Sequence, residues 1–191
     1  MTDIEVDYGF DVSTSVIGVC VLNAHTGEMI HMYPVKMVKA SLEDIWDKIL
    51  YFRETLKKNH KQEWKVRRIF VEDVAKKFSP GFSSAGTIVT LAKMNAMVCM
   101  VGMEEFSIKP TFINVRSARS TLGIKIDTKD KKRSTKEKVF DIVLAMNPNF
   151  PWTTHIAKTG KHVGEVVYDK SCQDVGDAWV AARGGQCLNS L

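Results

Sequence analysis

Four acidic residues in apolar or small-residue surroundings are the first candidates for chemistry in this chain. They are Asp11, Glu72, Asp174 and Asp177. A carboxylate in an apolar segment is costly to bury unless a positive charge compensates it. Hard divalent cations take oxygen ligands, and pairs of such ions held by several carboxylates hydrolyse phosphodiesters. The quartet therefore predicts a site for one or two divalent metal ions that acts on a phosphodiester.

The first two candidates interrupt or end apolar strands. Asp11 follows Gly9-Phe10, and Glu72 ends an apolar run. Asp7 is on the same face as Asp11 but lies in a more polar stretch, so we rank it lower. Neighbouring strand residues point to opposite faces, so Glu72 and Asp73 cannot both join one site, and we select Glu72. The alternatives are a turn-capping aspartate and a solvated acidic pair at a strand end.

Asp174 and Asp177 open a segment with helical character. Three residues apart on a helix, they share a face, where two like charges destabilise the helix unless something bridges them. Apolar residues follow at 178–182 and would press the helix onto a sheet. We therefore expect the pair to lie beside Asp11. The alternative is an acidic first turn stabilised by the helix dipole.

The elements that must position these carboxylates follow from hydrophobic period and turn residues. We expect strands at 4–10, 15–22, 29–35, 66–73 and 111–115. We expect helices at 42–60, 85–106, 117–122, 134–146 and 173–184. This order predicts an α/β fold in which a mixed five-stranded sheet, antiparallel first and parallel afterwards, is flanked by helices. We interpret 1–191 as a single domain with an extra hairpin or loop excursion at 147–171.

Composition indicates the class of partner. The chain has 191 residues, a net charge of +5 and an ordinary globular balance of 45% hydrophobic and 26% charged residues. Residues 125–138 hold seven basic and three acidic side chains; they would either contact DNA phosphates or form a solvated stretch. We expect a soluble, intracellular protein, cytoplasmic or nucleoid-associated, that is neither secreted nor membrane-bound. The chain starts with acidic residues, has no unbroken apolar run of ~18 residues and has four scattered cysteines.

The ordered motifs resemble the RuvC family of Holliday junction resolvases, within the ribonuclease H-like superfamily, and their divergence is similar to that of phage or viral types. Gly9-Phe10-Asp11, a small polar turn and Gly18-Val19-Cys20-Val21 match the family's first hairpin. Phe70-Val71-Glu72 matches its second acidic strand, and Asp174-Val175-Gly176-Asp177-Ala178 matches its last helix. No single motif is specific, but their order is.

The resemblance implies a homodimeric crossover junction endonuclease of DNA recombination and repair. It would nick two opposing strands of a four-way junction symmetrically and leave 5′ phosphates and 3′ hydroxyls. The four carboxylates would be catalytic and would bind two Mg²⁺ ions per site, with Mn²⁺ substituting. Branched DNA would be the partner, and a helicase partner is unknown.

The resemblance also implies DNA contacts from the loop after the Glu72 strand and from the basic stretch before the last helices. The candidate DNA-binding residues are Lys76, Lys77, Phe78, Phe82, Arg116, Arg119, Lys125, Lys131, Lys132, Arg133 and Lys136. One loop phenylalanine would stack on an unpaired base, unless it folds onto the core. One basic residue would assist transition-state charge. The helix 85–106 would form the dimer interface, unless it is a buried central helix, through Met94, Met97, Met100 and Met103.

Three other functions remain in competition at this point. Another ribonuclease H-like nuclease, acting on forks, flaps or RNA–DNA hybrids, would have a nearly identical site. A non-catalytic branched-DNA-binding relative would not need all four carboxylates. An actin-like ATPase shares a similar first strand, but it needs two such domains, for which 191 residues are too few.

Overall fold

The computed structural model describes residues 3–37, 42, 44–73, 85–127, 129–160 and 163–189. In chain order the elements are β1 (Ile4–Val12), β2 (Val16–Asn23), β3 (Met29–Lys36), α1 (Ile45–Asn59), β4 (Trp64–Glu72), α2 (Ala85–Phe106), β5 (Thr111–Ile113), α3 (Val115–Thr121), α4 (Thr135–Met146), β6 (Thr154–Ile156), β7 (Val166–Tyr168) and α5 (Ser171–Leu188).

The main sheet has five strands in the order β3-β2-β1-β4-β5. The pairs β1–β2 and β2–β3 are antiparallel, whereas β1–β4 and β4–β5 are parallel. The predicted mixed sheet, with antiparallel strands first and parallel strands afterwards, is confirmed. The central strand β1 is buried from Val6 to Val12 because it has neighbours on both edges and helices on both faces.

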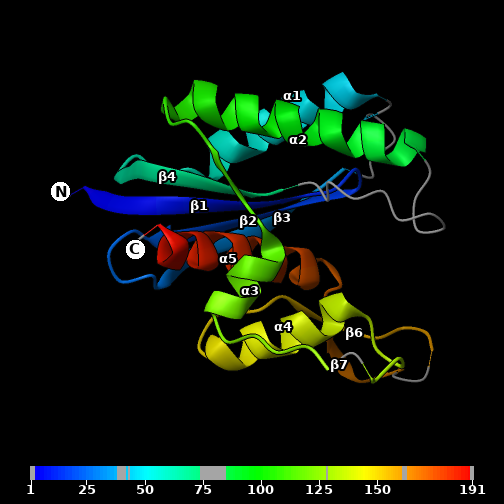
Figure 1. The fold of residues 1–191 in the computed structure, drawn as a ribbon. Coiled ribbons are helices and arrows are strands. Elements are labelled where there is room, and N and C mark those ends of the chain that lie inside the picture. The colour runs from blue at the N-terminus through cyan, green and yellow to red at the C-terminus, as the bar shows by residue number, and fades with distance from the viewer. Residues whose placement is uncertain are drawn as a thin grey trace.

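Helices cover the two faces of the sheet unequally (Figure 1). One face carries α1 and α2, whose side chains pack on Phe10, Ile69 and their neighbours. The other face carries α5, backed by α3 and α4, around a second core that includes Phe70 and Trp179. The carboxyl ends of β1 and β4 and the first turn of α5 lie at the same end of the molecule (Figure 1). Ligands of open α/β sheets bind at such strand ends.

Local capping explains where two of the helices begin. The Ser134 side chain accepts from the Glu137 backbone, and the Glu137 carboxylate accepts from the Ser134 backbone, so α4 starts with a capping box. The helix α1 begins later than predicted, because the Asp44 carboxylate accepts from the backbone N–H groups of Trp46 and Asp47. Ser41, which precedes the predicted start of this helix at residue 42, lies outside the residues that the structure describes.

The strands β6 and β7 form a separate antiparallel hairpin within residues 147–171. An isolated two-stranded hairpin is marginally stable in water, so its attachments matter. The Tyr168 ring contacts the Phe140 ring of α4 at 5.4 Å, and the Asp169 N–H donates to the Thr153 carbonyl at 2.9 Å. The Asp169 carboxylate also accepts from the N–H of Ser171, the first residue of α5, so the hairpin base leads into the helix that carries Asp174.

The helix α2 packs on the sheet along only part of its surface. It is the one helix of the described chain that is long and apolar enough to span a membrane, and 28% of that stretch is buried. The core helix of a soluble protein passes the same test. Its inner face includes Val98, Val101 and Gly102, which are buried. Among the residues that the structure describes, nothing covers the exposed side chains Val89, Met100 and Met103 of this helix.

Candidate active site

Three of the four predicted carboxylates meet around a single ammonium group. The Nζ atom of Lys136, at the start of α4, lies 3.1 Å from Asp11 Oδ2, 2.7 Å from Asp174 Oδ1 and 3.5 Å from Asp177 Oδ2. Asp11 is 7% exposed and Asp177 is 2% exposed. Residues more than a hundred positions apart in the sequence therefore form one charged cluster.

Two glycines let α5 approach the sheet closely enough to form this cluster. A Cβ atom at Gly18, the β2 residue paired with Asp11, would lie 2.2 Å from the backbone oxygen of Asp174. A Cβ atom at Gly9 would lie 2.3 Å from the backbone oxygen of Ala178. Any side chain at either position would hold the helix away from the sheet, so both glycines belong to the geometry of the site.

Glu72 belongs to the same cluster from the end of β4. Burial and the nearby charges of Asp11 and Asp177 raise the pKa of Glu72 to about 8, and its side chain hydrogen-bonds to Asp11. Asn95 of α2 donates to the Glu72 carbonyl at 3.0 Å and so ties the strand end to the helix layer. The structure therefore brings all four predicted carboxylates into one electrostatic neighbourhood.

The titration of these groups indicates that the cluster lacks positive charge. Burial raises the pKa of Asp11 to about 6, because the lowering effect of Lys136 is opposed by Asp177 and Asp174. Burial also raises the pKa of Asp177, although Lys136 and Arg119 oppose it. Burial lowers the pKa of Lys136, but the three aspartates outweigh it and hold the ammonium above its ordinary range. A further cation would stabilise the ionised cluster.

The donor set fits a hard divalent ion, although its present arrangement does not cage one. Within the described part of the chain, no three Asp, Glu, His or Cys side chains are grouped so that they could hold a metal ion. The Lys136 ammonium lies between the aspartates and satisfies the charge that a cation would satisfy. Carboxylate oxygens are the ligands that Mg²⁺ and Mn²⁺ prefer. Asp11, Glu72, Asp174 and Asp177 would hold such ions once the Lys136 side chain, which is 45% exposed, moved aside.

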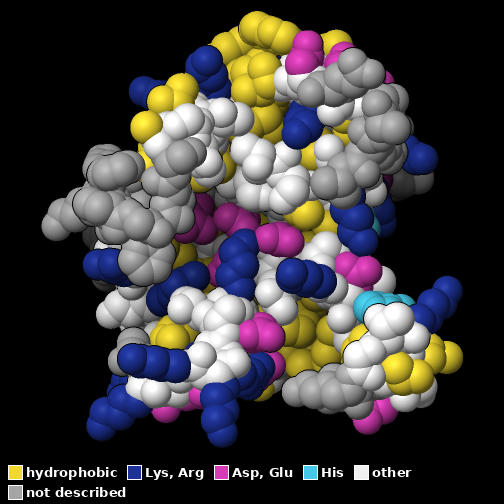
Figure 2. Space-filling model, turned by 90° about the vertical axis from the view of Figure 1, so that its right-hand side faces the viewer, with side chains coloured by type: hydrophobic (Ala, Val, Ile, Leu, Met, Phe, Trp, Pro, Cys, Tyr) yellow, Lys and Arg dark blue, Asp and Glu magenta, His cyan; other side chains and the backbone are white. Residues whose placement is uncertain are grey.

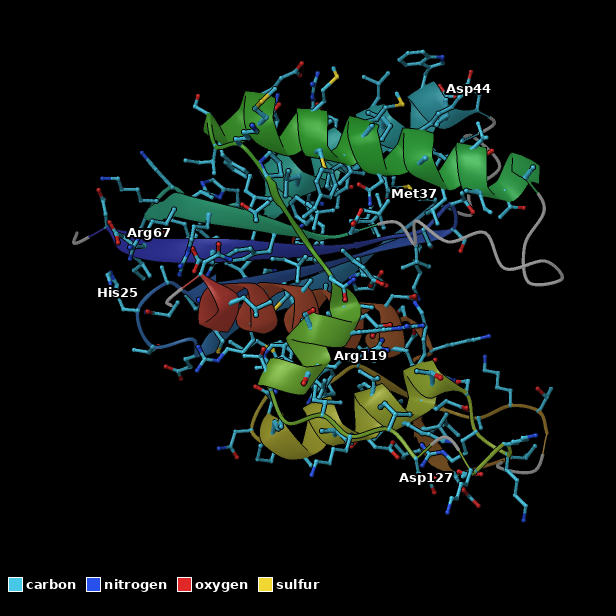
Figure 3. The ribbon with its side chains drawn as sticks, viewed as in Figure 1. His25, Met37, Asp44, Arg67, Arg119 and Asp127 are labelled. Carbon is cyan, nitrogen blue, oxygen red and sulfur yellow. The ribbon has the colours of Figure 1, made fainter. Side chains whose placement is uncertain are left out.

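Arg119 is the second basic residue in direct contact with the cluster. It extends from α3 towards α5 (Figure 3), where its Nη2 atom donates to Asp177 Oδ1 at 3.1 Å. Its Nε atom is buried and has no hydrogen-bond partner within the part of the chain that the structure describes. Arg116 and Lys125 are exposed nearby and line the same hollow as Arg119.

The other predicted DNA-binding residues divide into two groups. Lys131, Lys132 and Arg133 are exposed in the segment before α4, and Arg133 pairs with Asp141 at 2.6 Å. None of them contacts the carboxylates. The predicted loop contacts lie outside the residues that the structure describes: Lys76, Lys77, Phe78 and Phe82.

Asp7, which the sequence ranks below Asp11, has a structural role. Its carboxylate is fully buried and accepts from Arg68 Nη2 at 2.6 Å and from Gln186 Nε2 at 2.8 Å. These contacts join β1, β4 and the last turn of α5. They set the position of α5 along the sheet, four strand residues away from Asp11.

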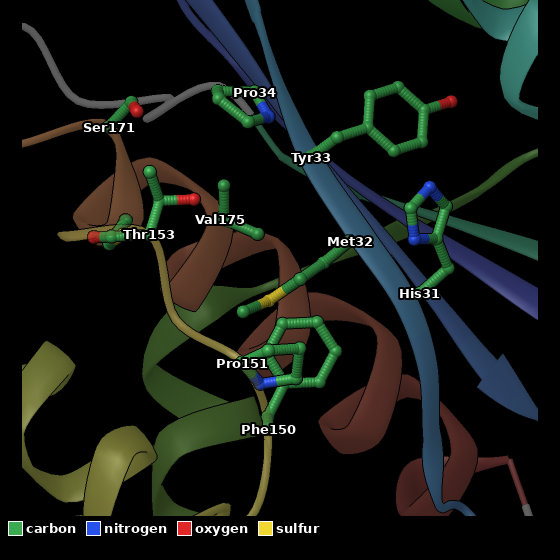
Figure 4. A pocket seen from close by; sticks show the side chains of 10 residues that line it. His31, Met32, Tyr33, Pro34, Phe150, Pro151, Thr153, Ser171 and Val175 are labelled. Atoms are coloured by element: carbon green, nitrogen blue, oxygen red, sulfur yellow. The ribbon is translucent and has the colours of Figure 1, made fainter. Parts of the chain in front are cut away.

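The face that carries the cluster is acidic at its centre. Figure 2 shows acidic side chains gathered there, with Lys and Arg side chains on both sides and below. A separate pocket of about 180 Å³ lies between β3, the segment around Phe150 and the start of α5 (Figure 4). None of the described residues that line this pocket is a carboxylate. It is therefore a mainly apolar crevice, distinct from the charged centre.

Lys136 and the two glycines are the functional residues whose roles were not assigned from sequence. Lys136 was predicted as one DNA contact among many, and its central place depends on α4 packing against α5. The sequence identifies Gly9 and Gly18 only as parts of the motif shared with the RuvC family. Two features of the sequence could have indicated their role: Gly9 lies two positions before Asp11, on the same strand face, and Gly18 lies in the strand that pairs with it.

The chain was compared with known proteins. No family model and no curated protein matches the sequence. Among solved structures, RuvC of T. thermophilus in complex with a Holliday junction substrate superposes with a TM-score of 0.62 at 13% identity, over 97% of this chain and 95% of that one. A second Thermus thermophilus RuvC structure gives 0.59 at 14% identity, with the same two coverages.

A third match comes from a different source. The yeast mitochondrial Holliday junction resolvase Ydc2 superposes with a TM-score of 0.55 at 13% identity, over 100% of this chain and 81% of that one. At these identities the likeness concerns the fold. The arrangement of strands and helices and these superpositions agree with the resemblance carried by the motifs. The chain has the fold of the RuvC-like Holliday junction resolvases, a mixed five-stranded ribonuclease H-like sheet flanked by helices.

Proposed function

We propose that this protein is a metal-dependent endonuclease that resolves four-way DNA junctions. The observation that carries the proposal is the meeting of Asp11, Asp174 and Asp177 around Lys136, with Glu72 beside Asp11, at the strand ends of a RuvC-like fold. Structural neighbours with this fold include Holliday junction resolvases, one of them solved with its junction substrate. Carboxylates converging at such a place suit phosphodiester hydrolysis.

The residues have separable tasks in this reaction. Bound Mg²⁺ would supply an activated water and charge stabilisation for the leaving 3′ oxygen. Asp11, Asp174 and Asp177 would bind the ions, and Glu72 would complete the set once deprotonated. Lys136 would turn from the carboxylates towards the scissile phosphate, and Arg119, already bonded to Asp177, would add positive charge beside it. Such preorganised cations stabilise developing negative charge. The products would carry 5′ phosphates and 3′ hydroxyls.

Paired nicks in a junction require two sites, and we propose a homodimer formed through α2. Met100 and Met103 are 53% and 46% exposed, so they are available to a second copy. The prediction for Met94 is wrong, because its side chain is 1% exposed and packs in the chain's own core. Met97 is partly buried against that core. Hydrophobic side chains are also exposed on the outer surface of the α1 and α2 layer, at the top of Figure 2. An exposed apolar surface of this kind marks an interaction site.

Cleavage of four substrates in Mg²⁺ tests the proposal: a four-way junction, a fork, a linear duplex and an RNA–DNA hybrid. We expect symmetric nicks in the junction and little cutting of the others. Asp11→Asn, Glu72→Gln, Asp174→Asn and Asp177→Asn should each abolish cleavage but leave junction binding in place. Asp141→Asn, an exposed carboxylate paired with Arg133 on α4, is the matched control and should cut normally. Preferred cutting of the hybrid or the fork would assign the chain to another ribonuclease H-like activity.

A further inference from the structure

Two hollows adjoin the carboxylate cluster. The first, which we call the Arg116 hollow, has a volume of about 540 Å³ and includes Arg116, Arg119, Lys125 and Thr135 in its lining. The second, which we call the Lys36 hollow, has a volume of about 500 Å³ and includes Ser15, Lys36, Lys136, Lys170 and Asp174.

The cluster lies between these two hollows. The Lys36 hollow reaches it directly, because Asp174 and Lys136 are part of its wall. The Arg116 hollow reaches it through Arg119, which donates to Asp177. Thr135 and Lys136 are successive residues of the first turn of α4, and each faces a different hollow. Figure 2 shows basic side chains on both sides of the acidic centre, as this arrangement requires.

The Arg116 hollow has unsatisfied capacity to bind an anion. None of the described residues in its lining is acidic. The Nε–H of Arg119 is buried with no acceptor among the described residues, although Nη2 of the same guanidinium is bonded to Asp177. A buried donor without a partner is costly, and a phosphate oxygen in the hollow would satisfy it. Hydrogen bonds from a guanidinium to a phosphate are charge-assisted and therefore stronger than those between neutral groups.

The Lys36 hollow has cations that are only weakly engaged. Lys36 Nζ lies 3.3 Å from both carboxylate oxygens of Asp169, and its side chain is 49% exposed. Exposed ion pairs of this kind contribute little stability. Asp169 makes shorter hydrogen bonds elsewhere, since it accepts from the Ser171 N–H at 2.9 Å and from the Ser171 hydroxyl at 2.5 Å. Lys36 can therefore turn to a phosphate, and the exposed Lys170 borders the same hollow.

We propose that the DNA strand to be cut lies across the carboxylate cluster, with its neighbouring phosphates held on opposite sides of the scissile one. Arg116 and Arg119 hold the phosphate on one side, and Lys36 holds the phosphate on the other. Held at both ends, the scissile phosphate is centred over the carboxylates, which is the positioning that in-line hydrolysis needs. This strand path rests on the proposed nuclease function, and it adds Lys36 and Lys170, which no sequence motif indicated.

The test combines protein variants with single neutral phosphates in the DNA. A set of four-way junctions carries one methylphosphonate each, placed in turn at the phosphates that flank the cleavage position. The affinity of the wild type, Lys36→Ala and Arg116→Ala for each junction is measured in EDTA, where no cleavage occurs. Both side chains are exposed, so the variants should fold. On the unmodified junction each variant should bind about five- to tenfold more weakly, and the salt dependence should fall by about one charge. Lys58→Ala, an exposed lysine on α1, should bind as the wild type does.

Coupling between variant and modified phosphate decides the outcome. We expect Lys36→Ala to lose nothing further when a phosphate on one side is neutralised, and Arg116→Ala to lose nothing further for a phosphate on the other side. Losses that add at every position, or coupling of both variants to the same side, would overturn the strand path while wild-type junction cleavage still supported the nuclease. A wild type that neither binds nor cuts any branched DNA would overturn the function as well.

Discussion

Gly18→Ala tests how closely α5 must lie on the sheet. The added Cβ would sit 2.2 Å from the Asp174 backbone oxygen, whereas ordinary contacts begin near 3.4 Å, so the two must separate by about 1.2 Å. The neighbour is backbone in the first turn of a helix, not the end of a flexible side chain. The helix must therefore shift, and Asp174 moves away from Asp11 with it. Overpacking of this kind costs about 1–3 kcal/mol of stability.

The functional effect should exceed the loss of stability. A displacement near 1 Å at a reacting centre lowers rates about 100-fold, so we expect Mg²⁺-dependent cleavage to fall by that order at a temperature where the variant is folded by circular dichroism. Junction binding in EDTA should change little, because Lys36 and Arg116, which would hold the flanking phosphates, lie on β3 and α3 and not on α5.

Gly176→Ala is the matched control for this change. Gly176 lies on α5 between Asp174 and Asp177, but a Cβ there would meet Phe140 Cδ2 at 3.5 Å, an ordinary contact. Alanine in a helix interior is more stable than glycine by roughly 0.5–1 kcal/mol, so this variant should fold and cut as well as the wild type. A Gly18→Ala protein that melts and cuts as the wild type does would refute the close seating of α5.

The remaining predictions concern charge, pH and assembly. Lys136→Ala removes the ammonium that three aspartates share, so the metal-free variant should melt at a lower temperature than the wild type. Mg²⁺ should raise the melting temperature of the variant more than that of the wild type. An equal rise in both proteins would argue against a cation site there. The pKa of Glu72 rises from 4.5 to about 8 on folding, so the folded state holds the extra proton in that window and the metal-free protein should lose stability as pH rises through it. Melting curves in EDTA and in Mg²⁺ check this, and a flat profile in EDTA would contradict it. If the proposed dimer forms through α2, Met103→Glu should convert it into a monomer in sedimentation, because the exposed side chain would place a charge in that interface.

Local sequence was sufficient where local interactions decide structure. The helix predicted at 134–146 agrees with α4 within one residue, because its cap, Ser134, and its apolar period are local features. Hydrophobic runs likewise predict β1 to β5 and α2, because strand and helix formation depend mainly on residues a few positions apart. The order of these elements then permits few topologies, and the observed sheet is the predicted one.

Tertiary packing decided what those elements bring together. Met94 packs in the chain's own core, because α2 places this side of the helix against the sheet. The hydrophobic periodicity of a helix that is apolar all round does not indicate which side will face the sheet. Asp7 and Asp11 share a strand face, yet one meets Arg68 and Gln186 and the other meets Lys136. That difference arises from partners more than fifty residues away.

The sequence by itself therefore determined the list of carboxylates, the order of elements and the kind of chemistry. Only the tertiary structure decided which cation stands among the carboxylates, which glycines bring α5 onto β1 and β2, and which basic side chains line the two hollows. Lys136 and Asp11 are 125 positions apart, so no local pattern records their contact. Their distance is set by the packing of α4 on α5 and of α5 on the sheet, where a shift of about an ångström would separate them.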